Sequence, residues 1–429
     1  MPSRAAHTVT RRDDGARVIS APMRERASAS IALMVAAGSR HEPGDRAGLA
    51  HFIEHMAFKG ADLHPDARAI SEAIEGVGGV LNAATDKEMT MFWAKVPAEH
   101  LDLAAAVIGD MVWHSRFDPV EIAKERDVVV EELRMSLDNP QEWVGTLFEE
   151  VMWPGHALGR DTGGTEDSVR TLDREDCLRF VREQYRPDST VVTVAGAVEA
   201  AAAEEAGARA LGRWGEAAVA AAAPEPAADL PRNGSRVRVV NKRTEQANLC
   251  FGARSRSYQD EDRFGVDVMT TILGDGMSSR LFLQLREELG LAYDVHAFTV
   301  KHRDSGALGI YVGCEPRRAD AAMAAAIAEL ERLATEPVPE RELQKVRAYL
   351  TGRLRVQLEG TSSFCTFLGQ QELLNGEIME PDEVVRRIEA VSAEDVRRLA
   401  AETLEAGLVG AVIGPFTKPD KFEKRLALS

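Results

Sequence analysis

The residues with the clearest capacity for chemistry lie in one stretch, G-L-A-H-F-I-E-H-M-A-F-K-G, from Gly48 to Gly60. This stretch holds His51, Glu54 and His55 in the order H-x-x-E-H. On a helix, residues i and i+4 lie on one face, so both imidazoles can point at the same spot. Two neutral imidazoles with a carboxylate nearby form a zinc site that lacks only a third protein ligand. Two unrelated core or surface histidines would give the same spacing, because so short a pattern also arises by chance.

A predicted helix over residues 119–137 carries carboxylates that could complete this site. Glu125 and Glu132 are seven residues apart, which is two helical turns, so they share a face. Val128 and Val129 lie between them and indicate that this face is buried. We therefore expect Glu132 to be the third ligand and Glu125 to orient the ligands from behind.

The neighbouring Glu131 lies about a hundred degrees around the same helix and should meet solvent. The alternative is a helix with ordinary surface glutamates. The spacing alone does not decide between the two.

The chain contains an internal repeat, seen as three patterns that recur at offsets of 217, 221 and 219 residues. Offsets this similar, over three separate elements, predict two copies of one folding unit. The matches are Asp45-Arg46-x-Gly48 with Asp262-Arg263-x-Gly265, Glu121-x-x-Lys124-x-Arg126 with Glu342-x-x-Lys345-x-Arg347, and Glu175-Asp176-x-x-Arg179 with Glu394-Asp395-x-x-Arg398.

The second copy lacks the candidate site. Its positions equivalent to the H-x-x-E-H residues hold Val268, Thr271 and Ile272. The positions equivalent to the two glutamates hold Val346 and Arg353. A structural role shared by both copies would have kept polar residues in both, so the sequence predicts a site in the first half only.

The order of helical and alternating segments predicts an α+β fold with two homologous domains. Each should be a mainly antiparallel sheet with helices packed on one face. The predicted N-terminal domain covers residues 1–215 and the C-terminal domain residues 235–429. An Ala- and Pro-rich linker is predicted between them, over residues 216–234. The strands expected in the first domain are residues 28–37, 80–85, 88–96 and 190–196, with a hairpin over residues 7–20.

Composition restricts the class of protein. The 429 residues are 45% hydrophobic and 28% charged, which is ordinary for a soluble globular protein. A formal net charge of −17 argues against nucleic acid or an anionic membrane as partner. The four cysteines form no C-x-x-C pair, and neither a membrane span nor a secretory signal is recognisable. We therefore expect a cytoplasmic protein with free thiols.

Two segments, H-F-I-E-H-M-A-F-K-G and E-R-D-V-V-V-E-E-L-R, closely resemble the inverted zinc peptidase family of pitrilysin, insulin-degrading enzyme and mitochondrial processing peptidase. The resemblance covers essentially the whole chain, including G-S-R-x-E, G-G-V-L-N-A and G-M-S-S-R-L-F-L-Q-L-R-E-E-L-G-L-A-Y. In that family the metal-binding glutamate follows the second histidine by 77 positions, which is the separation of His55 and Glu132.

The resemblance implies a zinc metalloendopeptidase with one Zn²⁺ per chain. His51, His55 and Glu132 would hold the ion and leave a fourth position for water. Glu54 would take the proton of that water and pass it to the leaving amine, with Glu125 supporting the ligands. The reaction would be peptide-bond hydrolysis without a covalent intermediate.

The resemblance also implies residues that bind the peptide. Asn82 and Ala83, on the strand over residues 80–85, would contact the substrate backbone by β-augmentation. From the residues alone, Asn82 is equally well an ordinary strand asparagine. Arg286 and Tyr293 would bind a substrate carbonyl and help stabilise the oxyanion. From sequence alone, a surface arginine and a core tyrosine is the simpler interpretation of that pair.

Family members with four such units form a closed chamber, so this two-unit chain would supply half of one. Because the chain carries both the motif and the Arg/Tyr pair, we expect a homodimer that takes unfolded peptides or presequence-like segments. A heterodimer with a related chain is the alternative. Two other functions compete: a non-catalytic core-type subunit, and a catalytic subunit that needs a separate partner chain.

Overall fold

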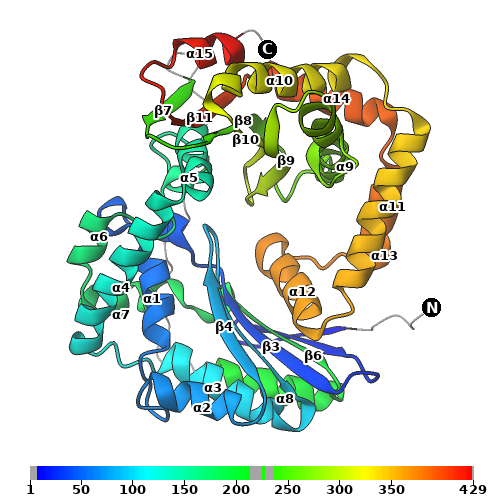
Figure 1. Cartoon of the computed structure of the whole chain (residues 1–429). Coiled ribbons are helices and arrows are strands. Elements are labelled where there is room, and N and C mark those ends of the chain that lie inside the picture. Colours follow the sequence, from blue (N-terminus) through cyan, green and yellow to red (C-terminus); the bar gives the residue numbers. More distant parts are fainter. Residues whose placement is uncertain (1–6, 213–224, 228–235, 428–429) are drawn as a thin grey trace. The chain divides into compact units, whose positions relative to one another are not determined.

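The structure is a computed structural model that describes residues 7–212, 225–227 and 236–427. The chain forms two compact units. The first comprises Met1–Leu133, Asp161–Glu225 and Arg355–Ile378, and the second comprises Arg134–Arg160, Pro226–Leu354 and Met379–Ser429. Each unit contains one mainly antiparallel sheet with packed helices, so the α+β prediction is confirmed (Figure 1).

The first unit is built on a six-stranded sheet in the order β1-β2-β6-β3-β5-β4. Neighbouring strands are antiparallel except β2 and β6, which are parallel. β4 pairs only with β5 and therefore forms an edge of the sheet. The strands are β1 (Thr8–Arg11), β2 (Arg17–Pro22), β3 (Ser28–Val35), β4 (Val80–Thr85), β5 (Thr90–Pro97) and β6 (Thr190–Gly196).

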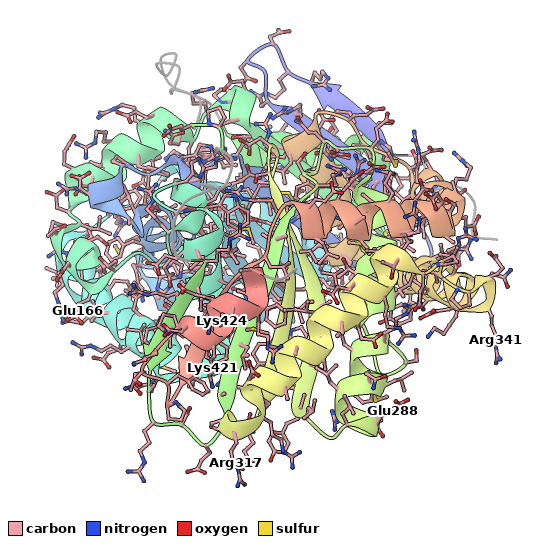
Figure 2. The ribbon with its side chains drawn as sticks, turned by 90° about the horizontal axis from the view of Figure 1, so that it is seen from above. Glu166, Glu288, Arg317, Arg341, Lys421 and Lys424 are labelled. Atoms are coloured by element: carbon pink, nitrogen blue, oxygen red, sulfur yellow. The ribbon has the colours of Figure 1, made fainter. Side chains whose placement is uncertain are left out.

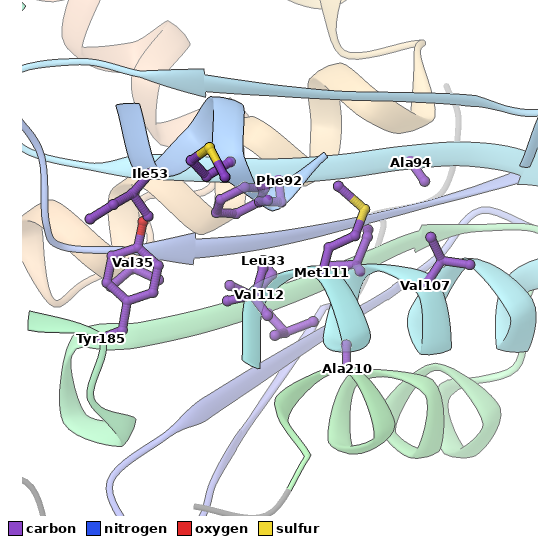
Figure 3. Close-up of a cluster of buried hydrophobic side chains, with 14 of the residues drawn as sticks. Leu33, Val35, Ile53, Phe92, Ala94, Val107, Met111, Val112, Tyr185 and Ala210 are labelled. Atoms are coloured by element: carbon purple, nitrogen blue, oxygen red, sulfur yellow. The ribbon is translucent and has the colours of Figure 1, made fainter. Parts of the chain in front are cut away.

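β3 is buried on both of its faces, which explains its apolar sequence S-A-S-I-A-L-M-V. Leu33 and Val35 point into the core that also contains residues of α1, α3 and α8 (Figure 3). The alternate residues Ala32 and Met34 pack with α12 on the opposite face. The helices that contribute to the first unit are α1 (Leu49–Ala57), α2 (Ala67–Glu75), α3 (Leu101–Trp113), α4 (Pro119–Asp138), α6 (Glu166–Thr171), α7 (Arg174–Gln184), α8 (Ala200–Leu211) and α12 (Thr361–Asn375).

The second unit repeats the topology of the first. Its strands have the order β7-β11-β8-β10-β9, with β7 and β11 parallel, which matches β2-β6-β3-β5-β4 position by position. This agreement confirms the predicted internal repeat. Its strands are β7 (Val237–Asn241), β8 (Ala247–Ser255), β9 (Ala292–Lys301), β10 (Gly306–Cys314) and β11 (Val409–Gly414). Its helices are α5 (Pro140–Met152), α9 (Arg263–Gly274), a π-helical segment (Phe282–Glu288), α10 (Ala319–Thr335), α11 (Glu340–Gln357), α13 (Pro381–Ala390), α14 (Ala393–Glu405) and α15 (Asp420–Ala427).

The two units are not the contiguous ranges expected from the sequence, because they exchange a helix. Helix α5, from the N-terminal half, belongs to the second unit, where Phe148 packs in one core cluster with Cys250 and Ala411. Helix α12, from the C-terminal half, belongs to the first unit, where Leu368 packs with Met34. Most of the predicted linker over residues 216–234 lies outside the described residues.

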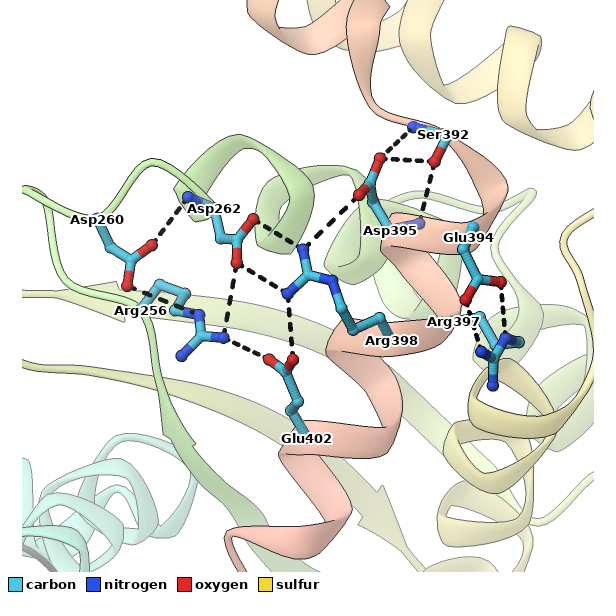
Figure 4. Close-up of polar contacts among 9 residues, drawn as sticks. All are labelled: Arg256, Asp260, Asp262, Ser392, Glu394, Asp395, Arg397, Arg398 and Glu402. Carbon is cyan, nitrogen blue, oxygen red and sulfur yellow. Dashed lines mark hydrogen bonds and ion pairs between the residues drawn. The ribbon is translucent and has the colours of Figure 1, made fainter.

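The repeated charged patterns have a structural cause that the second unit shows most fully. Arg398 of α14 donates to Asp262, just before α9, at 2.8 and 2.9 Å, and to Glu402 at 3.1 Å (Figure 4). In the first unit the roles are reversed, because Arg46 pairs with Asp176 of α7 at 3.1 Å. Both copies therefore use one ion pair to tie the segment before the α1 or α9 helix to the helix that precedes the last strand.

Charged side chains of both signs lie on the surface, for example Glu288, Arg317, Arg341 and Lys421 (Figure 2). The four cysteines are buried and carry free thiols. In the part of the chain that the structure describes, no helix is both long and apolar enough to cross a membrane.

Candidate metal centre

Helix α1 presents the H-x-x-E-H residues because its opposite face is anchored in the core. It begins after Gly48, whose φ of 92° lies in the left-handed region that favours glycine. The buried carboxylate of Glu42 accepts hydrogen bonds from the backbone N–H groups of Gly48 at 2.9 Å and Ala50 at 2.6 Å. These bonds satisfy N–H groups at the helix start that have no partner within the helix. The residues of α1 that are buried in the core are Leu49, Ala50, Phe52, Ile53, Met56 and Ala57.

His51, His55 and Glu132 point at one another, with ligand atoms that all lie within 4.8 Å. The two Nε2 atoms are 3.1 Å apart, and Glu132 Oε2 lies 3.5 Å from His55 Nε2 and 3.9 Å from His51 Nε2. A tetrahedral zinc ion with bonds of about 2.1 Å separates its ligand atoms by about 3.4 Å. The three side chains therefore fit a zinc ion in both chemistry and spacing.

Glu125 fixes the orientation of His55. Its side chain is 4% exposed, and His55 Nδ1 lies 2.9 Å from its Oε1. With Nδ1–H donating to this carboxylate, the lone pair of a neutral imidazole is on Nε2, which faces His51 and Glu132. Lys59 pairs with the other oxygen of Glu125 at 2.6 Å. A buried carboxylate is thereby held between two cationic or donating groups, and the role of Glu125 in orienting the metal ligands stays a prediction.

The electrostatic environment of the two imidazoles differs. Burial lowers the pKa of His51, and the neighbouring His55 lowers it further. Burial also acts to lower the pKa of His55, but the hydrogen bond that His55 donates to Glu125 and the charge of Glu132 outweigh it, so the net pKa is raised. Burial acts to raise the pKa of Glu125, whereas its bonds to His55 and Lys59 lower it on balance. Glu125 is therefore held as a carboxylate, which is the form that accepts from His55.

His51 Nδ1 is buried and has no hydrogen-bond partner in the part of the chain that the structure describes. A Cβ atom added at Gly163 would lie 3.8 Å from it, so the loop after α5 passes directly behind this ring. With no acceptor for Nδ1–H, the local structure leaves the tautomer of His51 to be set by what its Nε2 binds.

Glu54 lies on the same helix but is outside the ligand set. Its Oε2 accepts a hydrogen bond of 2.5 Å from the hydroxyl of Thr85, at the end of β4. Glu54 is partly buried, and among the described residues its other oxygen has no hydrogen bond. The structure thus separates one carboxylate that can bind a metal, Glu132, from one that can act beside it.

Asn82 and Ala83 lie on β4, which confirms the strand expected over residues 80–85 and lies at an edge of the sheet. Asn82 is exposed, and its side-chain oxygen accepts from the backbone N–H of Ala83 at 2.8 Å. The substrate contacts assigned to these two residues stay predictions.

Arg286 and Tyr293 belong to the second unit. Arg286 is exposed in the π-helical segment, with its guanidinium 5.0 Å from the centre of the Phe282 ring. Tyr293, at the start of β9, is 61% exposed, so it is not the core tyrosine that the sequence alone suggested. Their role toward the metal ligands stays a prediction.

In the described part of the second unit, other residues occupy the positions equivalent to the candidate ligands. Val268, Thr271 and Ile272 are all buried in α9, and Thr271 donates its hydroxyl back to the helix backbone. Arg353 of α11, at the position equivalent to Glu132, pairs with Asp275 at 3.2 Å. Apolar residues and an ion pair replace the ligands there.

The prediction that both valines of α4 lie on its buried face was wrong for one of them, and three residues around the candidate site were not predicted. Val128 is 50% exposed, and of the two adjacent valines only Val129 is buried. The missed residues are Glu42, Lys59 and Thr85. The i to i+4 spacing of His55 and Lys59 could have revealed Lys59, whereas the contacts of Glu42 and Thr85 depend on the fold.

Two family models match the chain: "Insulinase (Peptidase family M16)" over residues 17–166, and "Peptidase M16 inactive domain" over residues 171–350. The chain is 34% identical over 420 residues to the uncharacterized zinc protease SCO5738 of Streptomyces coelicolor, covering 96% of this chain and 90% of that protein. It is 33% identical over 388 residues to the uncharacterized zinc protease YmxG of Bacillus subtilis, covering 90% and 93%. Among solved structures, a protease from Helicobacter pylori has the same fold, with a TM-score of 0.89, 22% identity, and coverage of 96% of this chain and 100% of that one. The chain therefore belongs to the M16 family of peptidases.

Proposed function

We propose that this protein is a zinc endopeptidase that binds one Zn²⁺ per chain through His51, His55 and Glu132. The observation that carries the proposal is the convergence of these three side chains within 4.8 Å, with Glu125 fixing the lone pair of His55 toward the same point. The zinc protease names of the relatives support the choice of metal.

When bound, zinc would acidify a water molecule and polarise the scissile carbonyl, as is general for catalytic zinc sites. Glu54 acts as general base toward that water and then as general acid toward the leaving amine. Its free oxygen suits this role, since only Oε2 is held by Thr85. Peptide-bond hydrolysis then requires no covalent bond between the substrate and the protein.

The substrate is proposed to be an extended peptide that pairs with the edge strand β4. An edge strand offers unpaired backbone N–H and C=O groups, which an unfolded segment can bind in any sequence. Asn82 and Ala83 would contact the substrate backbone, and Arg286 and Tyr293 would bind its carbonyl oxygen and the oxyanion.

We also propose a homodimeric chamber, with a heterodimer as the alternative. Its support is that one chain carries both the metal ligands and the exposed Arg286 and Tyr293. The cytoplasm is the proposed compartment, because four buried free thiols suit a reducing environment.

The competing proposal is that the protein is a non-catalytic subunit, and features of the second half of the chain support it. Residues 171–350 match a family model described as inactive, and the second unit has lost every ligand position. The first unit nevertheless keeps His51, Glu54, His55 and Glu132, and a purely structural subunit has no use for that set.

The decisive experiment combines metal analysis with a quenched, mixed-sequence peptide library. We expect wild type to bind one zinc and cleave peptides, Glu54→Gln to keep zinc but lose cleavage, and Glu132→Gln to lose zinc. Glu131→Gln is the matched control, since this exposed neighbour on α4 should change neither property. Zinc bound without cleavage would favour a missing partner chain, and absence of bound zinc would refute the peptidase function.

A further inference from the structure

Thr85 is a residue at the metal centre to which neither the sequence motifs nor the comparisons give a role. It ends the edge strand β4, and its hydroxyl donates to Glu54 Oε2 at 2.5 Å. Hydrogen bonds from a hydroxyl to a carboxylate are short and strong compared with neutral ones. This bond is the single polar contact that holds Glu54 among the described residues.

A second hydroxyl, that of Thr90, lies on the core side of Thr85. Thr85 and Thr90 are directly opposite each other in the β4–β5 ladder, and their hydroxyl oxygens are 3.4 Å apart. Thr90 is fully buried and donates to the backbone carbonyl of Ala37 at 2.8 Å. With its own proton committed to Ala37, Thr90 could only accept from Thr85, across 3.4 Å. The Glu54 carboxylate is the nearer and charged acceptor at 2.5 Å, so the proton of Thr85 goes to Glu54.

The position of Glu54 needs such a restraint. It lies on α1 between His51 and His55, and a glutamate side chain there is long enough to turn toward the same point as the imidazoles. As a fourth protein ligand it would close the open position that a catalytic zinc site requires. Holding Oε2 on β4 keeps Glu54 beside the ligand set and leaves Oε1 free.

We propose that Thr85 is a positioning residue, which anchors Glu54 on the edge strand so that Glu54 serves as a base and not as a ligand. This inference rests on the proposed peptidase function. It adds a link between the peptide and the base, because the strand proposed to pair with the peptide is the strand that orients Glu54. Peptide pairing along β4 would then steady Thr85 and Glu54 together.

The test compares Thr85→Val, which removes the hydroxyl but keeps the β-branched shape, with Thr85→Ser, which keeps the hydroxyl. Thr10→Val is the matched control, on the strand at the opposite edge of the same sheet. Each protein is measured for zinc content, for kcat and KM on one peptide chosen from the library, and for the Glu54 conformation in crystals of the zinc-loaded form.

We expect Thr85→Val to keep one zinc per chain and a KM within about twofold of wild type, with kcat reduced about 10- to 100-fold. Thr85→Ser and Thr10→Val should stay close to wild type. In crystals of Thr85→Val, Glu54 should leave its position on β4. An unchanged kcat, or an unmoved Glu54 carboxylate in Thr85→Val, would overturn the proposal. If wild type with bound zinc cleaves no peptide, a missing partner chain is favoured, and the crystal comparison still decides whether Thr85 positions Glu54.

Discussion

Glu125 offers the sharpest test of how the metal centre is built, because it touches a ligand without being one. Its buried carboxylate receives His55 Nδ1–H at 2.9 Å and pairs with Lys59 at 2.6 Å. Replacing it should leave all three ligands in place but release the ring of His55. The expected effect is on zinc affinity and not on the number of ligands.

The expected loss of zinc affinity depends on which interactions of Glu125 each substitution removes. Losing a hydrogen-bond partner of a metal ligand typically weakens metal affinity by about 10- to 100-fold, or about 1.4 to 2.8 kcal/mol. Glu125→Gln keeps an oxygen that can accept from Nδ1–H but loses the charge, so we expect about tenfold. Glu125→Ala removes the acceptor and leaves Lys59 unpaired, so we expect about 100-fold.

The assay is competition for zinc against a chelator of known affinity, at constant pH and with thermal unfolding of each apo protein as a check on folding. Glu121→Gln is the control, because Glu121 lies on the same helix but, among the residues that the structure describes, pairs only with Lys124. Equal zinc affinities for wild type, Glu125→Gln and Glu125→Ala would refute the argument that Glu125 orients His55.

Three further predictions concern the scaffold. Glu42→Gln should lower the free energy of unfolding by about 1 to 2 kcal/mol, because the carboxylate that caps α1 becomes a neutral amide. Urea denaturation measures this free energy. Arg398 lowers the pKa of Asp262, so this pair contributes stability above the carboxyl's unfolded pKa of about 4 and loses it as pH falls through the lower folded value. The free energy of unfolding should therefore change less between pH 7 and pH 3 for Asp262→Asn than for wild type. An equal change with pH in the two proteins would contradict this. Leu368→Ala should cost about 2 to 5 kcal/mol by leaving a cavity against the first sheet, and calorimetry should place the loss in the unit that carries His51, His55 and Glu132.

The site was largely predictable from the sequence because helical periodicity is a strong constraint. The spacing of His51 and His55 set one face of α1, and the seven-residue separation of Glu125 and Glu132 set one side of α4. Val128 was misassigned because adjacent helix positions differ by about a hundred degrees, and the buried face of α4 contains Val129 and Val130 while Val128 lies outside it. The contact of Thr85 with Glu54 could not be predicted from the sequence, since it joins the end of a strand to a helix that is distant in sequence.

The exchange of α5 and α12 could not be predicted either. An amphipathic pattern tells which side of a helix is apolar, but not which of two similar sheets will cover it. Sequence order favours the nearer sheet, and both helices pack with the more distant one.

The exchange of α5 and α12 delays the complete burial of the first sheet during synthesis. The first sheet has all its strands once the ribosome has passed Gly196, yet the helix that covers its second face ends at Asn375. At about 5 to 20 residues per second, those 179 residues take roughly 10 to 35 seconds to make. During that interval the face of the first sheet that packs against α12 is not yet covered. This apolar face includes Ile19, Met34 and Met91. A chaperone that binds nascent apolar sheets would find its target in the half of the chain that carries the metal ligands.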